Sequence, residues 1–535
     1  MIIPRGERVG ANKPYDMIVE FMNIKFALAL TVIGFTLLHA KSIDQVKTRS
    51  GTLKGTLSAD GKVRAFKGIP YAAPPVGPLR WKAPQPESRW QGVREANAFG
   101  ARCMQGNVFG DMVFRDSGPS EDCLYLNVWS PVPEGKNHVL LPVMVWIYGG
   151  GYVGGASSEP RQDGEMLAKK GVVVVSMNYR LGVFGFLAHP GLAKETGRSG
   201  SGNYGLLDQV AALEWVQKNI KAFGGDPFNV TIFGESAGSF SVSGLMASPL
   251  GKGLFQKAIG ESGAFFGSSL AVQPIAQAQL TGEKFASSVG ASSIDELRAK
   301  PADDLLKATM KNPMGFPVTI DGSFFPEDPN AIYAAGKQAH VPLLAGWNAN
   351  EAPAQMIFGK NAANAAAFQT VLHERYKDAA DKLLELYPAT TDEQAEQSAG
   401  ALASDSFIGY STWAWLEMQR TTGQSTVYRY EFDDAPPTTP SRGAYHSAEI
   451  EFVFEALPSK NLPWRPEDTK LSDLMSTYWT NFAKTGDPNG PGLPAWPPYA
   501  AGAGNPVMHL SFDPKAEPDQ NRARYEFLQT MFAKK

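Results

Sequence analysis

The segment FGESAGSF, residues 233–240, contains a serine whose spacing from two glycines indicates catalysis. Ser236 is preceded by Gly234 and followed by Gly238, each two positions away. This G-x-S-x-G spacing is typical of a sharp strand-to-helix turn that exposes a nucleophilic hydroxyl, although an ordinary tight turn can share it. The apolar run VTIF before the motif and the small residues after it are the context that such an elbow requires. We therefore predict that Ser236 is a nucleophile.

A serine hydroxyl needs three further kinds of group before it can attack a carbonyl carbon at neutral pH. They are a base, an acid that orients the base, and donors for the oxyanion. The N–H of Ala237, directly after the serine, is in the position of one donor. The run YGGGY, residues 148–152, can supply others because glycine lets backbone amides approach a ligand closely. A flexible turn is the alternative interpretation of this run.

The base has to be chosen among seven histidines. His39 falls in an apolar segment near the start, and His138 and His189 precede the serine, which is the wrong order for Ser…acid…His. The histidines that follow the serine are His340, His373, His446 and His509. The pattern favours His446, because its loop follows a late segment that is predicted to be a strand.

The acid should lie between the serine and this histidine, on a loop after a strand. Glu351 meets the requirement, since it follows the apolar run VPLLAG. The rivals that the pattern leaves open are Asp321, Asp405 and Asp433. A second serine motif, GESGA, contains Ser262 but has Ala264 in place of the second glycine. We expect Ser262 to support the site rather than to attack the substrate.

The elements that must position these residues are predicted to form an α/β fold. Segments 141–148 and 171–177 are apolar throughout, as central parallel strands are, and 341–346 and 425–432 are further strand candidates. Residues 205–223 carry apolar side chains at helical spacing. Strands that alternate with helices favour a mainly parallel sheet with helices on both faces and with long loop and helical insertions.

The composition is that of a large globular protein. The chain has 535 residues, of which 43% are hydrophobic and 19% charged, and its formal net charge is −3. No basic bias points to nucleic acid as a partner. No segment resembles a linker, so residues 41–535 are predicted to form one domain, in which the helix-rich segment 271–308 is a cap-like or lateral region.

Cys103 and Cys123 are the two cysteines of the chain. In an exported protein this pair favours a disulfide, and two buried free thiols are the alternative. Two cysteines without a histidine cluster do not make the usual structural zinc site. We expect neither a metal nor an organic cofactor.

Residues 22–40 are predicted to be a secretory signal. Lys25 gives a positive start, the apolar run 26–38 is too short for a comfortable membrane span, and Ala40 suits a cleavage site. An uncleaved anchor and a buried helix are the alternatives. Residues 1–21 then form an upstream extension. The remaining chain is expected to be exported, to the periplasm or the medium, without a stable membrane span.

Several longer segments resemble the type B carboxylesterases, α/β-hydrolases that include the cholinesterases. FGGDPFNVTIFGESAG resembles the family's nucleophile signature, and EDCLYLNVWSP resembles its second signature. Other matching segments are FKGIPYAAPPVGPLRW, WIYGGGY, NYRLGVFGFL, GNYGLLDQ, YWTNFAKTGDPN and LPAWPPY. The resemblance runs from about Val46 to the C-terminus. It implies the α/β-hydrolase fold and the hydrolysis of small carboxylic esters through an acyl-enzyme.

The resemblance also implies roles for single residues. The catalytic triad that it implies is Ser236, Glu351 and His446. The oxyanion donors that it implies are Gly150, Gly151 and Ala237. Its other matches are Glu235 as a buried acidic neighbour of the nucleophile, Glu449 in an H-x-x-E pattern, and a disulfide between Cys103 and Cys123.

Two departures from the family's pattern bear on the site. Ala352 stands where a glycine often follows the acid, which can reshape that loop. The segment between Cys103 and Cys123 lacks the tryptophan with which cholinesterases hold a quaternary ammonium by cation–π attraction, so a choline ester is disfavoured. Short-chain or aromatic esters are the expected substrates. An amide, a carbamate or a pyrethroid-type ester is the alternative, and the rival from another class is a non-catalytic binding protein.

Overall fold

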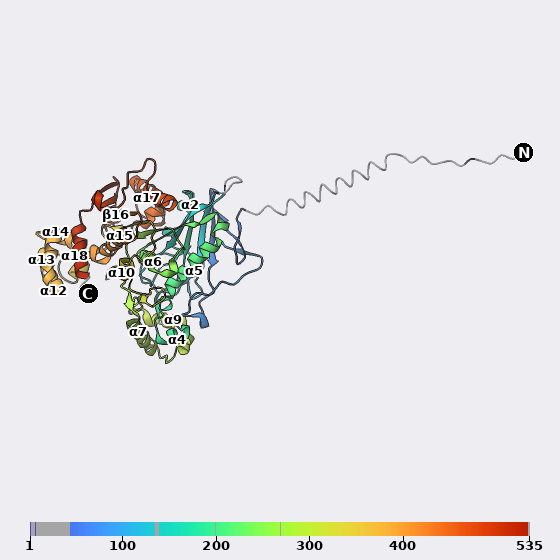
Figure 1. Ribbon diagram of the computed structural model, residues 1–535, viewed down its shortest axis with the longest axis horizontal. Coiled ribbons are helices and arrows are strands. Elements are labelled where there is room, and N and C mark those ends of the chain that lie inside the picture. Colours follow the sequence, from blue (N-terminus) through green and yellow to red (C-terminus); the bar gives the residue numbers. More distant parts are fainter. Residues whose placement is uncertain (2–5, 7–42, 134–138, 198–199, 268, 533–535) are drawn as a thin grey trace. The chain divides into compact units, whose positions relative to one another are not determined.

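A mixed β-sheet of 11 strands forms the centre of the fold (Figure 1). The structure is a computed structural model that describes residues 1, 6, 43–133, 139–197, 200–267 and 269–532. From one edge to the other, the strands are β18 (Lys515–Pro518), β17 (Pro506–Leu510), β16 (Val427–Phe432), β15 (Leu343–Asn348), β12 (Lys257–Glu261), β11 (Gly225–Glu235), β9 (Leu141–Ile147), β10 (Val173–Met177), β8 (Tyr125–Pro131), β4 (Val63–Pro70) and β3 (Thr56–Leu57). Neighbours from β17 to β10 are parallel, and the pairs at the two ends are antiparallel. The predicted fold class is confirmed.

The central strands are covered on both faces of the sheet. Every residue of β10, β12 and β15 is buried, and successive side chains of a strand point to opposite faces. The helices that pack against the sheet include α2 (Glu165–Lys169), α5 (Tyr204–Asn219), α6 (Ala237–Ala247), α15 (Tyr410–Thr422) and α17 (Pro466–Thr485). This cover on both faces explains why the strand segments are apolar throughout rather than alternating.

The predicted helix over 205–223 is α5 followed by the 3₁₀ turn η3 (Ile220–Phe223). Gly224 ends it in the left-handed conformation, with φ 90°. The remaining α-helices of the described chain are α3 (Gly182–Phe186), α4 (Pro190–Thr196), α7 (Ile275–Ser288), α8 (Ile294–Ala299), α9 (Ala302–Thr309), α10 (Pro329–Ala334), α11 (Gln355–Phe358), α12 (Ala365–Tyr376), α13 (Ala380–Leu386), α14 (Asp392–Ser404), α16 (Ile450–Val453) and α18 (Arg522–Phe532). Its short outlying strands are β1 (Gln45–Lys47), β2 (Thr52–Lys54), β5 (Val93–Glu95), β6 (Arg102–Cys103), β7 (Pro119–Ser120), β13 (Gln273–Pro274) and β14 (Thr319–Ile320).

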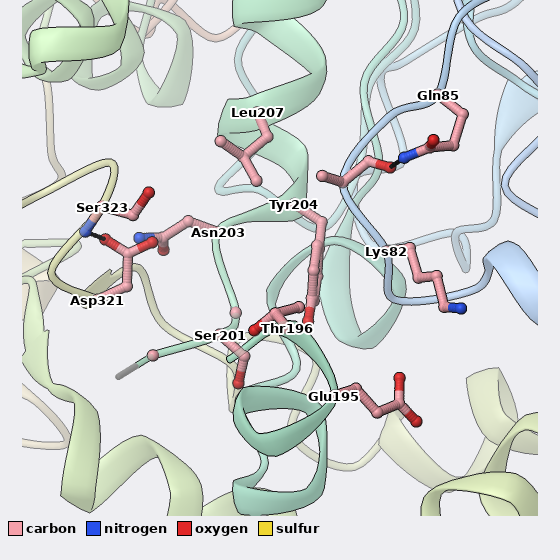
Figure 2. Close-up of a pocket in the computed structure, with 13 residues that line it drawn as sticks. Lys82, Gln85, Glu195, Thr196, Ser201, Asn203, Tyr204, Leu207, Asp321 and Ser323 are labelled. Carbon is pink, nitrogen blue, oxygen red and sulfur yellow. Dashed lines mark hydrogen bonds between the residues drawn. The ribbon is translucent and has the colours of Figure 1, made fainter. Parts of the chain in front are cut away.

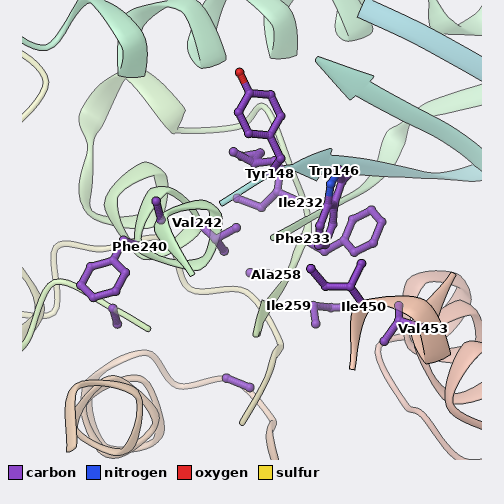
Figure 3. Close-up of a cluster of buried hydrophobic side chains, with 14 of the residues drawn as sticks. Trp146, Tyr148, Ile232, Phe233, Phe240, Val242, Ala258, Ile259, Ile450 and Val453 are labelled. Carbon is purple, nitrogen blue, oxygen red and sulfur yellow. The ribbon is translucent and has the colours of Figure 1, made fainter. Parts of the chain in front are cut away.

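Aromatic packing anchors the strand that leads to Ser236 (Figure 3). The ring of Trp146 on β9 lies 4.8 Å from that of Phe233 on β11 and 4.9 Å from that of Phe454, measured between centroids. All three side chains are fully buried. Each such aromatic pair adds about 0.5–1.5 kcal/mol beyond the burial of its area. The end of β11 is therefore held firmly where the nucleophile motif begins.

A second hydrophobic core lies among the helices of segment 271–308. Phe285 of α7, Leu297 of α8 and Leu305 of α9 pack in one cluster with Leu192 of α4. These helices gather beside α4 at one end of the unit (Figure 1). The segment is thus a lateral helical region with its own core.

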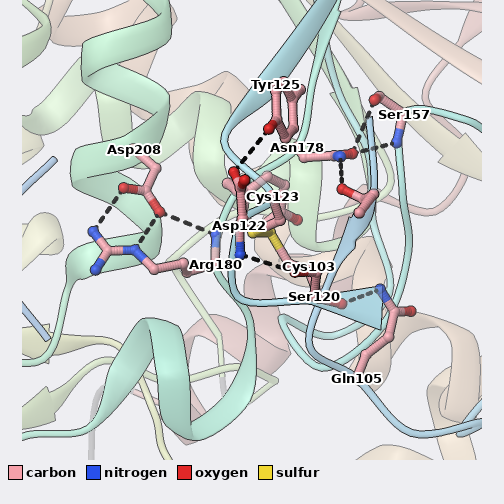
Figure 4. Close-up of a disulfide and its surroundings, with 12 residues drawn as sticks. Cys103, Gln105, Ser120, Asp122, Cys123, Tyr125, Ser157, Asn178, Arg180 and Asp208 are labelled. Carbon is pink, nitrogen blue, oxygen red and sulfur yellow. Dashed lines mark hydrogen bonds and ion pairs between the residues drawn. A yellow bond between two sulfur atoms is a disulfide. The ribbon is translucent and has the colours of Figure 1, made fainter. Parts of the chain in front are cut away.

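Cys103 and Cys123 form the predicted disulfide (Figure 4). Their Cα atoms lie 4.9 Å apart, and the sequence separation is 20. The loop between them is tied to the glycine-rich segment, because the amide of Gln105 donates to the Gly155 carbonyl at 2.8 Å and accepts from the Gly155 N–H at 3.0 Å. The disulfide therefore lies close to the predicted site.

The chain divides into two units, Met1–Gln45 and Val46–Lys535, and the second contains every predicted site residue. Residues 22–40, which are predicted to be a secretory signal, lie outside the described part of the chain. None of the helices in the described ranges is both long and apolar enough to cross a membrane.

Candidate active site

Ser236 lies at a strained turn between β11 and α6. Its φ of 53° and ψ of −124° fall in a region that residues other than glycine rarely occupy. The N–H of Ser236 donates to the carbonyl of Glu261 at 2.8 Å. Gly238 has no room for a side chain, because a Cβ there would lie 1.9 Å from the carbonyl oxygen of Ile147. The sequence motif thus folds as the predicted elbow.

The imidazole of His446 connects Ser236 to Glu351. Its Nε2 lies 2.9 Å from Ser236 Oγ, and its Nδ1 lies 2.5 Å from Glu351 Oε2. When Nδ1 donates its proton to the carboxylate, Nε2 is free to accept the proton of the serine. The fold therefore brings the three predicted residues within hydrogen-bond reach, although they come from loops after three different strands.

The carboxylate of Glu351 is held from two further directions. Its Oε1 accepts from the backbone N–H of Asn348 at 2.7 Å and from Ser262 Oγ at 2.6 Å. Ser262 therefore contacts the predicted acid. Asn348 was not predicted, and its side chain also donates to Glu449 at 2.5 Å and to the Tyr445 carbonyl at 2.8 Å. A polar residue at the end of an apolar strand was the signal for it.

The rival acids and bases have other partners. Asp321 accepts from two backbone amides of its own turn, Asp405 accepts from Tyr387 at 2.7 Å, and Asp433 lies 2.7 Å from His509. His340 and His373 are exposed side chains. The hydrogen bonds of Ser236 and His446 thus involve none of these residues.

The three amides predicted as oxyanion donors belong to two segments next to Ser236 in space or in sequence. The glycine run follows β9, where Gly150 and Gly151 have φ values of 106° and 59° that favour glycine. A Cβ on Gly149 would lie 2.9 Å from the Cβ of Ser236, so the run passes close to the serine. Ala237 begins α6 and has no acceptor within that helix. Among the described residues, no acceptor contacts the amides of Gly150, Gly151 or Ala237.

Buried glutamates dominate the electrostatics around the imidazole. Burial lowers the pKa of His446, but the carboxylates of Glu235 and Glu351 outweigh it and raise that pKa to about 9. Burial raises the pKa of Glu235 to about 7 and that of Glu449 to about 8. Glu261 is also buried, which raises its pKa well above the ordinary value, and it accepts from Trp479 Nε1 at 2.7 Å. Glu235 and Glu449 therefore titrate closer to neutral pH than an exposed glutamate does.

Two cavities lie near these elements. One of about 470 Å³ is at the start of α5, lined by Tyr204 and by the charged Lys82 and Glu195 among others (Figure 2). None of the predicted site residues is among its described lining residues. A second cavity of about 290 Å³ lies between the disulfide loop and Gly154, with Met112 on its wall. Of the two, the second is lined by Gly154, which lies two residues after the run 148–152.

The described residues contain no group of three or more histidine, cysteine, aspartate or glutamate side chains that could hold a metal ion.

Comparisons with known proteins agree with this geometry. The profile of the "Carboxylesterase family" matches residues 42–528. The para-nitrobenzyl esterase of Bacillus subtilis (strain 168) is 38% identical over 476 residues, which are 85% of this chain and 92% of that protein. The fumonisin B1 esterase of Sphingopyxis macrogoltabida is 37% identical over 471 residues, 84% of each chain. A solved structure of PNB esterase superposes with a TM-score of 0.78 at 36% identity, covering 91% of this chain and 99% of that one.

Proposed function

We propose roles for three residues of this chain, which belongs to the carboxylesterase family and is a carboxylic ester hydrolase. Ser236 is the nucleophile, His446 is the general base, and Glu351 is the acid that orients His446. Ser236 Oγ attacks the ester carbonyl carbon while its proton passes to His446 Nε2. The imidazolium then protonates the leaving alcohol, and the acyl group stays on Ser236. Water deprotonated by the same imidazole releases the carboxylic acid and restores the serine.

The negative charge that develops on the carbonyl oxygen requires donors. The amides of Gly150, Gly151 and Ala237 are proposed for this role, since Ala237 directly follows the nucleophile and the glycine run passes close to it at Gly149. Loss of one such donor typically lowers kcat by about 10²–10³-fold.

The observation that carries this proposal is the hydrogen-bonded series Glu351–His446–Ser236 at a strained serine. Backbone strain persists only where the surrounding fold enforces it, and it clusters at sites of chemistry. A binding protein on the same fold would need neither this strain nor the aligned imidazole, so catalysis is the better-supported function.

Short-chain or aromatic esters are the proposed substrates. A Cβ added to Gly150 would lie 3.2 Å from Cε of Met112, and one added to Gly151 would lie 2.8 Å from Cε of Met314. Two thioether side chains thus crowd the space beside the oxyanion donors with apolar surface. Two relatives are named as a para-nitrobenzyl esterase and a fumonisin B1 esterase, which supports an ester as the substrate class. An amide, carbamate or pyrethroid-type ester would use the same residues.

Hydrolysis of a p-nitrophenyl ester series, from acetyl to long acyl chains, tests this function. We expect turnover that falls with acyl length and is lost in Ser236→Ala. The matched control is Ser425→Ala, because the hydroxyl of Ser425 donates only to the carbonyl of Gly423, outside the site. No turnover of any ester by folded wild-type protein would favour the binding role.

Export is proposed from two features of the chain. Residues 22–40 have the composition of a secretory signal, and the disulfide between Cys103 and Cys123 is of a kind that persists in oxidising compartments. The mature protein is then a single domain of residues 41–535. N-terminal sequencing of the protein from its native host should give a start near Lys41, and an intact earlier start would contradict export through this signal.

A further inference from the structure

A π-helical turn interrupts a continuous helical stretch, residues 392–422. α14 continues into η6 (Asp405–Gly409), which continues into α15. The N–H of Tyr410 donates to the carbonyl of Asp405, five residues earlier, where an α-helix would use the residue four earlier. Such turns are rare and are frequent at functional sites. The turn therefore calls for a reason other than local sequence preference.

Two side chains of this helix reach the two ends of the acid–base pair. The hydroxyl of Ser404 accepts a hydrogen bond from the N–H of Ala352 at 3.1 Å and donates one to the carbonyl of Ala352 at 3.4 Å. Ala352 directly follows Glu351. The ring of Phe407 meets the imidazole of His446 edge to face, with centroids 5.3 Å apart and planes at 68°. Ser404 ends α14, and Phe407 lies in the π-helical turn that follows it.

The turn is fixed to the core from its opposite side. The buried carboxylate of Asp405 accepts from the hydroxyl of Tyr387 at 2.7 Å and lies 4.0 Å from Arg524. A Cβ on Gly409 would lie 3.1 Å from Asp405 Oδ1 and 3.5 Å from Nε1 of Trp347, a residue of β15. The turn is thus packed against the strand that leads to Glu351, and the two segments are expected to move together.

We propose that this π-helical turn positions the acid–base pair, with Phe407 as the positioning residue for His446 and Ser404 as the one for the Glu351 loop. Phe407 is half-buried, and its ring limits the rotation of the imidazole about the Cβ–Cγ bond. Displacement of a catalytic group by about 1 Å can lower the rate by about 10²-fold, so loss of the contact between Phe407 and His446 should lower kcat. The inference rests on the proposed roles of His446 and Glu351.

Steady-state kinetics of Phe407→Leu and Phe407→Tyr with p-nitrophenyl acetate and p-nitrophenyl butyrate test the role of the ring. We expect Phe407→Leu to lower kcat by about 10- to 100-fold for both esters with KM nearly unchanged. Phe407→Tyr keeps the aromatic ring and should retain most of the wild-type kcat. Ser404→Ala tests the other contact without altering the ring, and it should also lower kcat at an unchanged KM.

The matched control is Phe527→Leu, which removes a half-buried ring of α18 that packs on the core. It should leave kcat as in the wild type. A wild-type kcat in folded Phe407→Leu would overturn the proposal, and so would a KM that rises with acyl length at unchanged kcat, because Phe407 would then be a substrate contact. Lack of turnover by the wild-type protein would instead overturn the proposed ester hydrolysis, so the two failures are distinguishable.

Discussion

The Nε2 atom of His446 lies 3.3 Å from Oε1 of Glu235, so the imidazole faces a second carboxylate besides Glu351. Glu235 is 3% exposed, and the negative charge of its ionised form stabilises the imidazolium over the neutral ring. The base must be neutral to accept the proton of Ser236. We therefore expect the acid limb of kcat/KM to lie above the ordinary histidine pKa of about 6.5.

Glu235→Gln should move this acid limb to lower pH. The change removes a carboxylate that raises the pKa of His446, so that pKa falls and the neutral base persists at more acidic pH. The pH dependence of kcat/KM for p-nitrophenyl acetate checks the shift. Glu214→Gln, at an exposed position of α5, is the control and should keep the wild-type profile. An identical acid limb in wild type and Glu235→Gln would show that this carboxylate does not act on the base.

Ser262→Ala should lower kcat by about tenfold without a matching rise in KM. The hydroxyl of Ser262 donates to Glu351 Oε1 at 2.6 Å, and a hydrogen bond to a charged group contributes about 1.5–3 kcal/mol. Part of that energy orients the acid behind His446. Steady-state kinetics with one short ester measure the effect. Complete loss of activity would assign Ser262 a larger role, and an unchanged kcat would show that the N–H of Asn348 suffices.

Gly238→Ala should destabilise the protein. Its Cβ would lie 1.9 Å from the carbonyl oxygen of Ile147, and because that atom belongs to the backbone of β9 it cannot swing aside. Overpacking of this kind typically costs about 1–3 kcal/mol. Urea unfolding measures the loss. Gly502→Ala is the matched control, since a Cβ there meets nothing within 4 Å, and its unfolding midpoint should stay close to that of the wild type.

Removal of the disulfide should lower the free energy of unfolding by about 3 kcal/mol. The disulfide joins residues with a sequence separation of 20 and so reduces the conformational entropy of the unfolded chain, which gives this estimate. The double variant Cys103→Ser/Cys123→Ser and the reduced wild-type protein should unfold at the same, lower urea concentration. Midpoints equal to that of the oxidised protein would mean that packing alone holds this loop.

The sequence predicts the elements of this fold well because burial on both faces leaves a local pattern. The apolar runs of β9, β10 and β15 show where central strands lie, and the glycines around Ser236 are required by backbone that passes within contact distance. Pattern alone did not separate Glu351 from three aspartates. Resemblance to a family separated them, and the hydrogen bond between Glu351 and His446 agrees with that choice.

Other contacts around the triad, unlike that of Ser262, could not be predicted from the sequence. Ser404 and Phe407 reach Ala352 and His446 only because a helix with a π-helical turn packs against β15. No residue spacing predicts this turn, and the residues that it contacts are tens of positions away in the sequence. Asn348 is similar, since its bond to Glu449 joins two loops that only the tertiary fold brings together.

Acylation of Ser236 can be measured on the protein itself. Wild-type protein mixed with p-nitrophenyl acetate and quenched in acid within the first turnovers should carry one acetyl group, located by peptide mass spectrometry in the segment that contains Ser236. Ser236→Ala should carry none there and should lose hydrolysis. An acetyl group on another residue such as Ser262, or wild-type turnover by Ser236→Ala, would contradict the assignment of Ser236 as the nucleophile.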